Sequence, residues 1–195
     1  TDFPGIRKGN DSFLLIYNLE NELIENIVMI PLTGDDEIKE IIYYQGYLYM
    51  IQTSKSKVTR LIKMDIFGNT ILEQDINLQY GFYDVMIKLI NNELFLAYTK
   101  YDYEQMDYIC VINNFNEQLE LTEVYNKYFP GMKLIDFNID DGMKYILLNN
   151  IKNNTGYEYL VYDSKNELLG SYKSTSNDLI KGLTCKNVIV GTSND

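Results

Sequence analysis

The residues that most often carry enzyme chemistry are sparse in this sequence. The chain of 195 residues contains no histidine, which excludes Ser-His-Asp triads, Cys-His pairs and imidazole-ligated metals. Paired acids occur at Asp35-Asp36 and at Asp140-Asp141, and both pairs lie in polar stretches that we interpret as turns between strands. A mechanism built on lysine, tyrosine and carboxylates stays open, but no motif predicts one. We therefore expect no catalytic residues and no cofactor.

One acidic stretch, residues 136–142, superficially resembles a calcium-binding loop. It reads Asp-Phe-Asn-Ile-Asp-Asp-Gly. An EF-hand needs glycine at the sixth position and a bidentate glutamate at the twelfth, whereas here the glycine falls one place late and Leu147 stands at the twelfth position. We expect no metal site. The two cysteines, Cys110 and Cys185, are too few for a zinc cluster, and we expect buried thiols in preference to a disulfide.

Charge and hydropathy exclude two classes of partner. The formal net charge is -11, and the basic residues are scattered, which argues against binding to the phosphate backbone of a nucleic acid. The apolar runs are short, far below the roughly 20 residues that span a bilayer. Asparagine, isoleucine, lysine and tyrosine are abundant, which favours an AT-rich bacterial or phage source. The compartment is not indicated, since the chain begins at Thr1 and a targeting segment would lie outside it.

Four segments of the chain match one another and divide it into repeats. Each has an apolar strand end, then Asp or Asn, two free positions, Gly or Asn, and a second strand. The Asp/Asn positions are Asn18, Asp65, Asn113 and Asp163, spaced by 47, 48 and 50 residues, and the Gly/Asn positions are Asn21, Gly68, Asn116 and Asn166. Asp or Asn caps a turn through its side chain, and Gly or Asn tolerates a positive φ. We therefore predict a hairpin turn at each segment, with positive φ at the four Gly/Asn positions.

A second set of hairpins lies between the first, so that each period of about 48 residues holds four strands. This period and the strand-Asp-x-x-Gly turn resemble the repeats of β-propellers, including NHL-like and quinoprotein-like blades. The resemblance covers nearly the whole chain and identifies no subfamily. It implies an all-β protein, a β-propeller of four-stranded antiparallel blades.

The order of the hairpins predicts how the propeller closes. Complete blades are expected at roughly 38–76, 83–125 and 133–173. A hairpin at 13–29 precedes them and another at 179–192 follows. If these two hairpins pair, they form a fourth, split blade and close the ring, which removes exposed sheet edges. We predict this closure within a single domain of residues 1–195. The alternative is that the chain is part of a larger propeller.

Aromatic residues outside the strands mark a candidate binding face. The loops between the second and third strands, and between blades, share one face of a propeller, and here three of them are long and aromatic: residues 77–83, 99–107 and 125–131. Tyrosine offers contact area with a hydrogen-bonding tip, which suits protein interfaces and sugar stacking. The alternative is that the rings only cover blade edges. The candidate anchors are Tyr80, Phe82, Tyr101, Tyr103, Tyr128 and Phe129.

These features favour a non-enzymatic recognition or assembly module that binds a protein partner or a cell-surface glycan. A phage tail, an injection machine or a cell-surface complex is the setting that the composition and the fold suggest. Two alternatives stay open. One is a glycan lyase or hydrolase on a propeller scaffold, and the other is a structural spacer without a ligand of its own.

Overall fold

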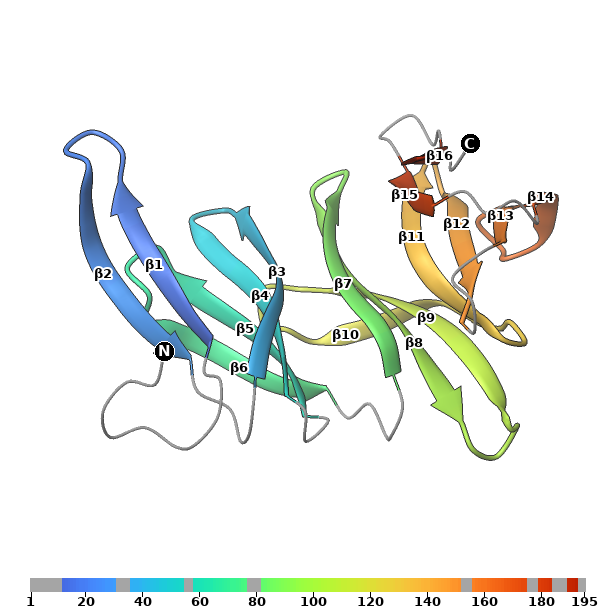
Figure 1. The fold of residues 1–195 in the computed structure, drawn as a ribbon, viewed down its shortest axis with the longest axis horizontal. Coiled ribbons are helices and arrows are strands. Elements are labelled where there is room, and N and C mark those ends of the chain that lie inside the picture. The colour runs from blue at the N-terminus through green and yellow to red at the C-terminus, as the bar shows by residue number, and fades with distance from the viewer. Residues whose placement is uncertain are drawn as a thin grey trace.

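The computed structural model describes residues 12–30, 36–54, 58–76, 82–151, 156–174, 179–183 and 189–192, and these residues form an all-β structure. Sixteen strands are present in this part of the chain, and it contains no helix, so none that could cross a membrane. The strands make three four-stranded antiparallel sheets and two two-stranded sheets (Figure 1).

The three large sheets coincide with the predicted repeats, and within each sheet every strand pairs with its neighbour in sequence. Blade 1 contains β3 (Asp36–Tyr44), β4 (Tyr47–Ser54), β5 (Thr59–Asp65) and β6 (Thr70–Ile76). Blade 2 contains β7 (Phe82–Ile90), β8 (Glu93–Asp102), β9 (Asp107–Phe115) and β10 (Leu121–Tyr128). Blade 3 contains β11 (Met132–Asp140), β12 (Met143–Asn150), β13 (Tyr157–Tyr162) and β14 (Leu168–Ser174). The N-terminal hairpin consists of β1 (Ser12–Asn18) and β2 (Leu23–Ile30), and the C-terminal hairpin of β15 (Leu179–Leu183) and β16 (Ile189–Thr192).

The first two strands of each blade are joined by a two-residue turn. The central residues of all three turns have positive φ: Gln45 and Gly46 in blade 1, Asn91 and Asn92 in blade 2, and Asp141 and Gly142 in blade 3. Positive φ at both positions defines the type I′ turn, whose twist matches that of the strands it joins.

The turns between the third and fourth strands confirm half of the predicted backbone conformations. Gly68 and Asn166 have φ of 90° and 63°. The prediction for Asn21 and Asn116 is wrong, because the positive φ falls on Glu22 (57°) and Leu119 (65°) instead.

In blade 2 the reason is a shift of the turn by three residues. The capping side chain is Asn116 and not Asn113, since Asn116 Oδ1 accepts hydrogen bonds from the backbone N–H groups of Gln118 (3.0 Å) and Glu120 (3.0 Å). The Leu119 N–H then closes the turn on the Asn116 carbonyl at 2.9 Å. The Leu119 side chain is buried between blades 1 and 2, and this burial offsets the cost of a left-handed conformation in a residue other than glycine.

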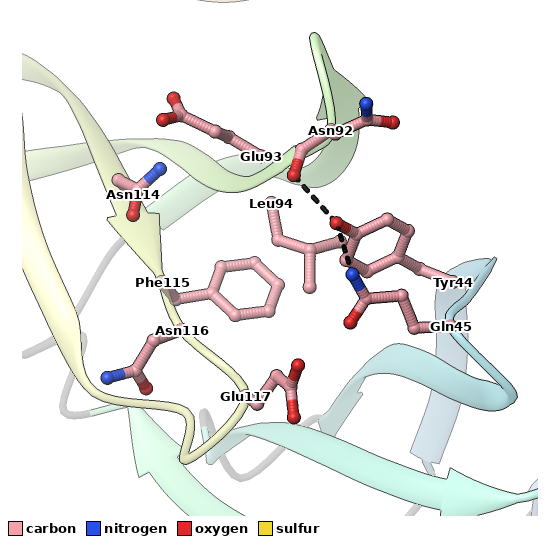
Figure 2. A pocket seen from close by; sticks show the side chains of 9 residues that line it. All are labelled: Tyr44, Gln45, Asn92, Glu93, Leu94, Asn114, Phe115, Asn116 and Glu117. Atoms are coloured by element: carbon pink, nitrogen blue, oxygen red, sulfur yellow. Dashed lines mark hydrogen bonds between the residues drawn. The ribbon is translucent and has the colours of Figure 1, made fainter.

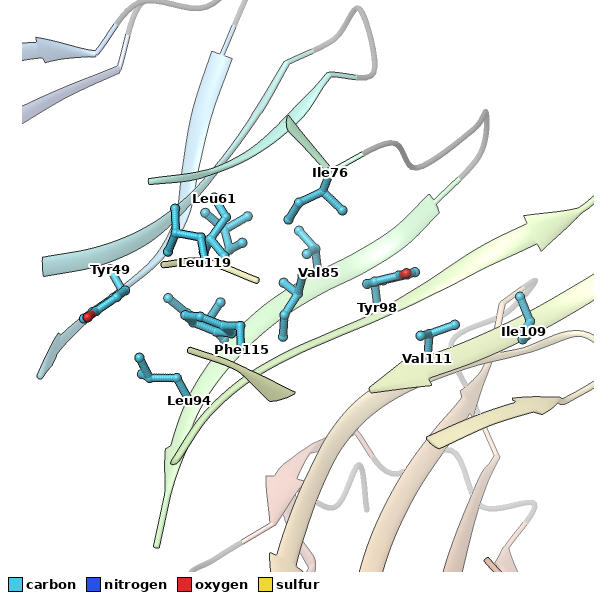
Figure 3. Close-up of a cluster of buried hydrophobic side chains, with 13 residues drawn as sticks. Tyr49, Leu61, Ile76, Val85, Leu94, Tyr98, Ile109, Val111, Phe115 and Leu119 are labelled. Atoms are coloured by element: carbon cyan, nitrogen blue, oxygen red, sulfur yellow. The ribbon is translucent and has the colours of Figure 1, made fainter. Parts of the chain in front are cut away.

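Neighbouring blades pack face to face through apolar seams. Between blades 1 and 2, side chains such as Leu61 and Tyr49 meet Leu94 and Phe115 (Figure 3). A second seam joins blades 2 and 3, and a third joins the N-terminal hairpin to blade 1. Strand β8 contributes alternate side chains to two seams, which explains its nearly continuous apolar sequence, Leu-Phe-Leu-Ala-Tyr.

The predicted closure into a four-bladed ring is wrong. The N-terminal and C-terminal hairpins, which were expected to pair as one split blade from 13–29 and 179–192, form two separate sheets. They lie at opposite ends of an open arc (Figure 1). Each hairpin packs against the blade next to it in sequence, the first on blade 1 and the second on β11. Each hairpin thus finds its apolar or strand contacts on the adjacent blade and not on the other hairpin, so the two do not complete one sheet.

The first strands of the blades lie side by side along the inside of the arc and are linked by charged groups. The β7 strand contacts β3 on one side and β11 on the other. The Glu40 carboxylate accepts a hydrogen bond from the Ile87 N–H of the next blade. The Asp136 carboxylate accepts a hydrogen bond of 2.7 Å from the Leu183 N–H, and it also forms an ion pair with Lys88. These carboxylates therefore tie each inner strand to its neighbour.

Candidate binding surface

The turn between β8 and β9 is short, in contrast to the long loop predicted for residues 99–107. The two strands run on to Asp102 and from Asp107, so that only residues 103–106 lie between them. Asp102 Oδ1 accepts hydrogen bonds from the N–H groups of Glu104 (2.9 Å) and Gln105 (3.2 Å), and Met106 has φ of 55°. A carboxylate cap followed by a left-handed residue fixes the direction of the turn.

Three tyrosine rings pack together at this turn. Tyr101 and Tyr108 are directly opposite each other in the β8–β9 ladder, and their ring centroids are 5.0 Å apart with an interplanar angle of 68°. Tyr103 contacts Tyr101 in the same edge-to-face manner, at 5.0 Å and 81°. Edge-to-face pairs are favourable because a positive ring edge meets a negative ring face. Tyr101 and Tyr108 are half-buried, while the side chain of Tyr103 is 58% exposed.

Tyr128, from the end of β10, lies on the other face of blade 2, because it pairs with Ile109 whereas Tyr101 pairs with Tyr108. Its hydroxyl donates a hydrogen bond of 2.6 Å to Asp102 Oδ2. This bond lowers the pKa of the Asp102 carboxyl, with help from the Gln105 and Glu104 N–H groups, and raises the pKa of the Tyr128 hydroxyl. At neutral pH the carboxylate therefore stays charged and the phenol stays protonated. We call Tyr101, Tyr103, Tyr108, Tyr128 and Asp102, which lie at this end of blade 2 on its two faces, the tyrosine surface.

Three of the six predicted anchors lie at this end of blade 2: Tyr101 and Tyr103 are in ring contact, and Tyr128 is on the other face. The Phe129 side chain instead packs against the seam between blades 2 and 3, while its N–H donates to the Tyr108 carbonyl at 2.9 Å. It has a structural role, so its assignment as an anchor is not supported. Tyr80 lies outside the described residues. The backbone of Phe82 pairs with Lys100 in the β7–β8 ladder, and its side chain also lies outside them.

Two features of the surface were missed from the sequence. Tyr108 falls one residue beyond the predicted loop 99–107 and was not named, although strand pairing across a short turn would have placed it opposite Tyr101. Asp102 was treated as a loop residue. Its spacing of two and three residues from the N–H groups that it caps is the signal that could have identified the turn.

A small pocket opens at the opposite end of the strands, between blades 1 and 2 (Figure 2). Its volume is about 210 Å³, below the roughly 300–1,000 Å³ of pockets for drug-sized ligands. The Tyr44 hydroxyl donates to the Asn92 carbonyl at 2.8 Å and accepts from Gln45 Nε2 at 2.8 Å. Leu94 and Phe115 form its apolar wall. This hydrogen-bonded chain joins the first turns of blades 1 and 2, so the pocket is part of the seam between them.

The described residues contain no group of three or more histidine, cysteine or acidic side chains placed to hold a metal ion. Cys110 is a free thiol buried between blades 2 and 3, next to the Thr99 hydroxyl at 3.5 Å, and burial raises its pKa to about 12. The thiol is therefore uncharged and unreactive at neutral pH. Cys185 lies outside the described residues.

Comparison with known proteins supports the fold and leaves the subfamily open. No family model matches the chain, and no curated protein matches it. Among solved structures, it is similar to the subtype N10 neuraminidase-like protein of A/little yellow-shouldered bat/Guatemala/060/2010, with a TM-score of 0.55 and 12% identity over 83% of this chain. It spans 59% of that protein's chain. The endo-arabinase of Bacteroides thetaiotaomicron aligns with a TM-score of 0.46 and 13% identity, over 87% of this chain and 75% of its own. At this level of identity the first likeness shows a β-propeller fold alone, and the NHL-like or quinoprotein-like resemblance stays a prediction.

Proposed function

We propose that the chain is a recognition module that binds a protein or a cell-surface glycan through the tyrosine surface. The observation that carries the proposal is that the exposed ring of Tyr103 packs edge to face on the half-buried pair Tyr101 and Tyr108. Tyr103 is supported by Tyr101, and the ring of Tyr128 is oriented by Asp102. Rigid aromatic side chains lose little conformational entropy on binding. A phage tail or bacterial surface assembly is the setting that the composition favours.

The exposed rings are not needed to fill a seam. None of Tyr101, Tyr103 and Tyr128 belongs to an apolar core cluster, whereas Phe129 beside them does. These rings are therefore not the outer part of a packed core. Exposed aromatic clusters of this kind concentrate binding energy at protein interfaces.

A single substitution with a matched control tests the proposal. Tyr103→Ala removes an exposed ring that contacts one other tyrosine. Tyr172→Ala, on β14, removes a ring of nearly equal exposure (57% against 58%) that contacts Tyr157 at 6.0 Å. We expect capture of a ligand, by glycan array or by affinity purification, to be lost in Tyr103→Ala and kept in Tyr172→Ala. The free energy of unfolding of both variants should stay within about 1 kcal/mol of that of the parent, as is usual for surface substitutions.

The result that contradicts the proposal is a ligand that both variants still bind, or a Tyr103→Ala variant that unfolds several kcal/mol early. The first outcome places binding elsewhere on the chain. The second shows that the ring supports the fold, as the alternative of rings covering blade edges requires.

An enzyme acting on glycans is the second candidate, because acids and a lysine meet on the inner strands. Glu40 has a raised pKa, chiefly through burial, and its environment includes Lys88 and Asp136. A pair of carboxyl groups is the common arrangement in glycoside hydrolysis. Turnover of polysaccharides, abolished by Glu40→Gln and by Asp136→Asn, would favour this candidate over the recognition module.

A further inference from the structure

The N-terminal hairpin has the turn that joins the third and fourth strands of a blade. Asn18 Oδ1 accepts a hydrogen bond of 2.8 Å from the N–H group two residues later, that of Glu20. Asp65 and Asp163 cap the turns of blades 1 and 3 with the same spacing, and all three ladders shift register one residue before the cap. Strand β1 therefore corresponds to a third strand. Among the described residues it pairs with β2 alone, whereas the third strands of blades 1 to 3 also pair with a second strand.

The C-terminal hairpin corresponds to the first two strands of a blade. Strand β15 lies against β11, as β11 lies against β7 and β7 against β3. The Leu183 N–H donates to the Asp136 carboxylate of the preceding blade, as the Ile87 N–H donates to Glu40. In the described part of the chain, β16 pairs with β15 and with no third strand. The two hairpins are therefore complementary halves of one blade, held at opposite ends of the arc (Figure 1).

Side chains of β1 that point away from blade 1 are exposed, although their counterparts in the complete blades are buried. The counterparts lie one and three residues before the cap of the turn, and none is more than 6% exposed: Met64 and Ile62, Phe115 and Asn113, Tyr162 and Leu160. In blade 1 this pair packs against the preceding unit, the N-terminal hairpin. The same positions in β1 are Tyr17 and Leu15, which are 46% and 43% exposed. They occupy the positions that face a preceding blade.

Strand β2 extends the exposed apolar surface. Ile27 and Ile24 lie directly opposite Leu15 and Tyr17 in the ladder, so they project from the same face, and both are exposed. Phe13 is two residues before Leu15 and shares this face as well. We call Phe13, Leu15, Tyr17, Ile24 and Ile27 the outer face of the N-terminal hairpin. Exposed apolar surfaces of this kind mark sites of protein association.

We propose that a second copy of this chain covers the outer face, and that its C-terminal hairpin joins the N-terminal hairpin of the first copy in one four-stranded blade. A second copy fits because each chain carries the half-blade that the other lacks. The same junction forms twice about a twofold axis, so the arrangement closes. It makes a ring of eight blades, six within the chains and two shared, and propellers commonly have about four to eight. The edges of β1 and β16 are then paired.

The ladders of the complete blades predict the register of the shared blade. In each, the residue three before the cap pairs with a buried residue of the second strand: Ile62 with Met50, Asn113 with Leu96, and Leu160 with Ile146. Leu96 pairs in turn with Ile87 of the first strand. Leu183 corresponds to Ile87 by its hydrogen bond to the preceding blade, and it pairs with Ile189. Ile189 of one copy should therefore lie opposite Leu15 of the other.

A disulfide tests this register on the intact chain. Leu15→Cys with Ile189→Cys, in a chain that also carries Cys185→Ser, places two thiols opposite each other across the shared blade. Opposite Cα atoms in an antiparallel pair are about 4.5–5.5 Å apart, which a disulfide spans. Cys110 is buried and stays unchanged. We expect air oxidation to give a covalent dimer on non-reducing gel electrophoresis.

A second cysteine pair is the matched control. Leu15→Cys with Val190→Cys, in the same background, moves one thiol to the other face of its strand. The two thiols then no longer lie opposite each other on one face, and the geometry of a disulfide is not met. This pair should form the covalent dimer at least about tenfold more slowly.

Sedimentation of the unmodified chain gives an independent measurement. We expect the mass of two chains, falling to that of one chain on dilution. Leu15→Lys should shift the equilibrium to one chain, because it places a charge on the outer face. Ile71→Lys, at a similarly exposed position on β6 of blade 1, should leave the mass unchanged.

A single-chain mass at every concentration overturns the inference, and it would mean that a different partner covers the outer face. A disulfide that forms within one chain also overturns it, because the two hairpins would then close on each other. Equal rates of cross-linking in the two cysteine pairs contradict the shared blade. None of these results bears on the tyrosine surface, which lies in blade 2.

Discussion

Replacing Gly68 with alanine should destabilise the chain by about 2–4 kcal/mol, for two separable reasons. Gly68 has φ of 90°, a conformation that costs a residue with a Cβ about 1 kcal/mol or more. A Cβ at this position would also lie 2.1 Å from Val28 Cγ2 and 3.2 Å from Val28 Cβ, in the N-terminal hairpin. Forcing an extra carbon into such a contact typically costs about 1–3 kcal/mol. The lower flexibility of alanine in the unfolded chain offsets less than about 1 kcal/mol.

Gly46 offers a matched control for the part of the destabilisation that comes from the backbone conformation alone. Its φ is 86°, and a Cβ there would meet nothing within 4 Å. Gly46→Ala should therefore cost about 1 kcal/mol, and the difference between the two variants measures the close approach of Val28. Urea denaturation followed by circular dichroism gives both values. Adding Val28→Ala to Gly68→Ala should recover part of the loss in a double-mutant cycle.

Equal destabilisation in Gly46→Ala and Gly68→Ala would refute the reasoning, because the contact with Val28 would then contribute nothing. The contact is informative because it places the turn of blade 1 against the first hairpin. Asn26 Nδ2 also donates to the Phe67 carbonyl at 3.0 Å in the same region.

Three further predictions follow from charge and exposure. The raised pKa of Glu40 means that the folded chain binds more protons than the unfolded chain above pH 4.5, so Glu40 lowers the free energy of unfolding as pH rises through that window. Glu40→Gln should therefore become more stable relative to the parent between about pH 4 and 7. Urea denaturation at each pH measures the difference. Tyr128→Phe should raise the pKa of Asp102 toward its ordinary value, which a carboxyl titration by NMR measures; an unchanged pKa would show that the backbone N–H groups alone hold it down. Leu15→Lys with Ile27→Glu, on the exposed face of the N-terminal hairpin, should reduce self-association in analytical ultracentrifugation.

The strands and the order of the hairpins could be predicted from the sequence because they rest on local rules. Alternating apolar residues and turn residues at regular spacing identify strands, and the strands of blades 1 to 3 agree with the predicted repeats to within a few residues. The turn of blade 2 was misplaced because tertiary burial of Leu119 overrides the preference for glycine at a left-handed position. Sequence spacing carries no information on such burial.

Closure and the candidate surface depended on geometry that local rules do not contain. The angle between blades is set by side chains that meet from different repeats, such as Tyr49 and Phe115, and no single repeat encodes it. The sequence predicted which loops are aromatic but not where each ring points. Tyr103 is exposed to solvent, whereas Phe129 packs inward against the seam between blades 2 and 3. Which outcome a loop residue takes depends on how close it lies to the neighbouring blade, and the spacing of residues in the sequence does not give that distance.

The seams predict that the free energy of local unfolding differs from one sheet to the next along the chain. Blade 2 has apolar seams on both faces, whereas one face of the N-terminal hairpin carries exposed side chains that include Leu15 and Ile27. Arrays in which each unit contacts mainly its neighbours lose structure from their least supported unit, without global unfolding. Backbone amides of β1 and β2 should then exchange with deuterium first, and those of β8 and β9 last.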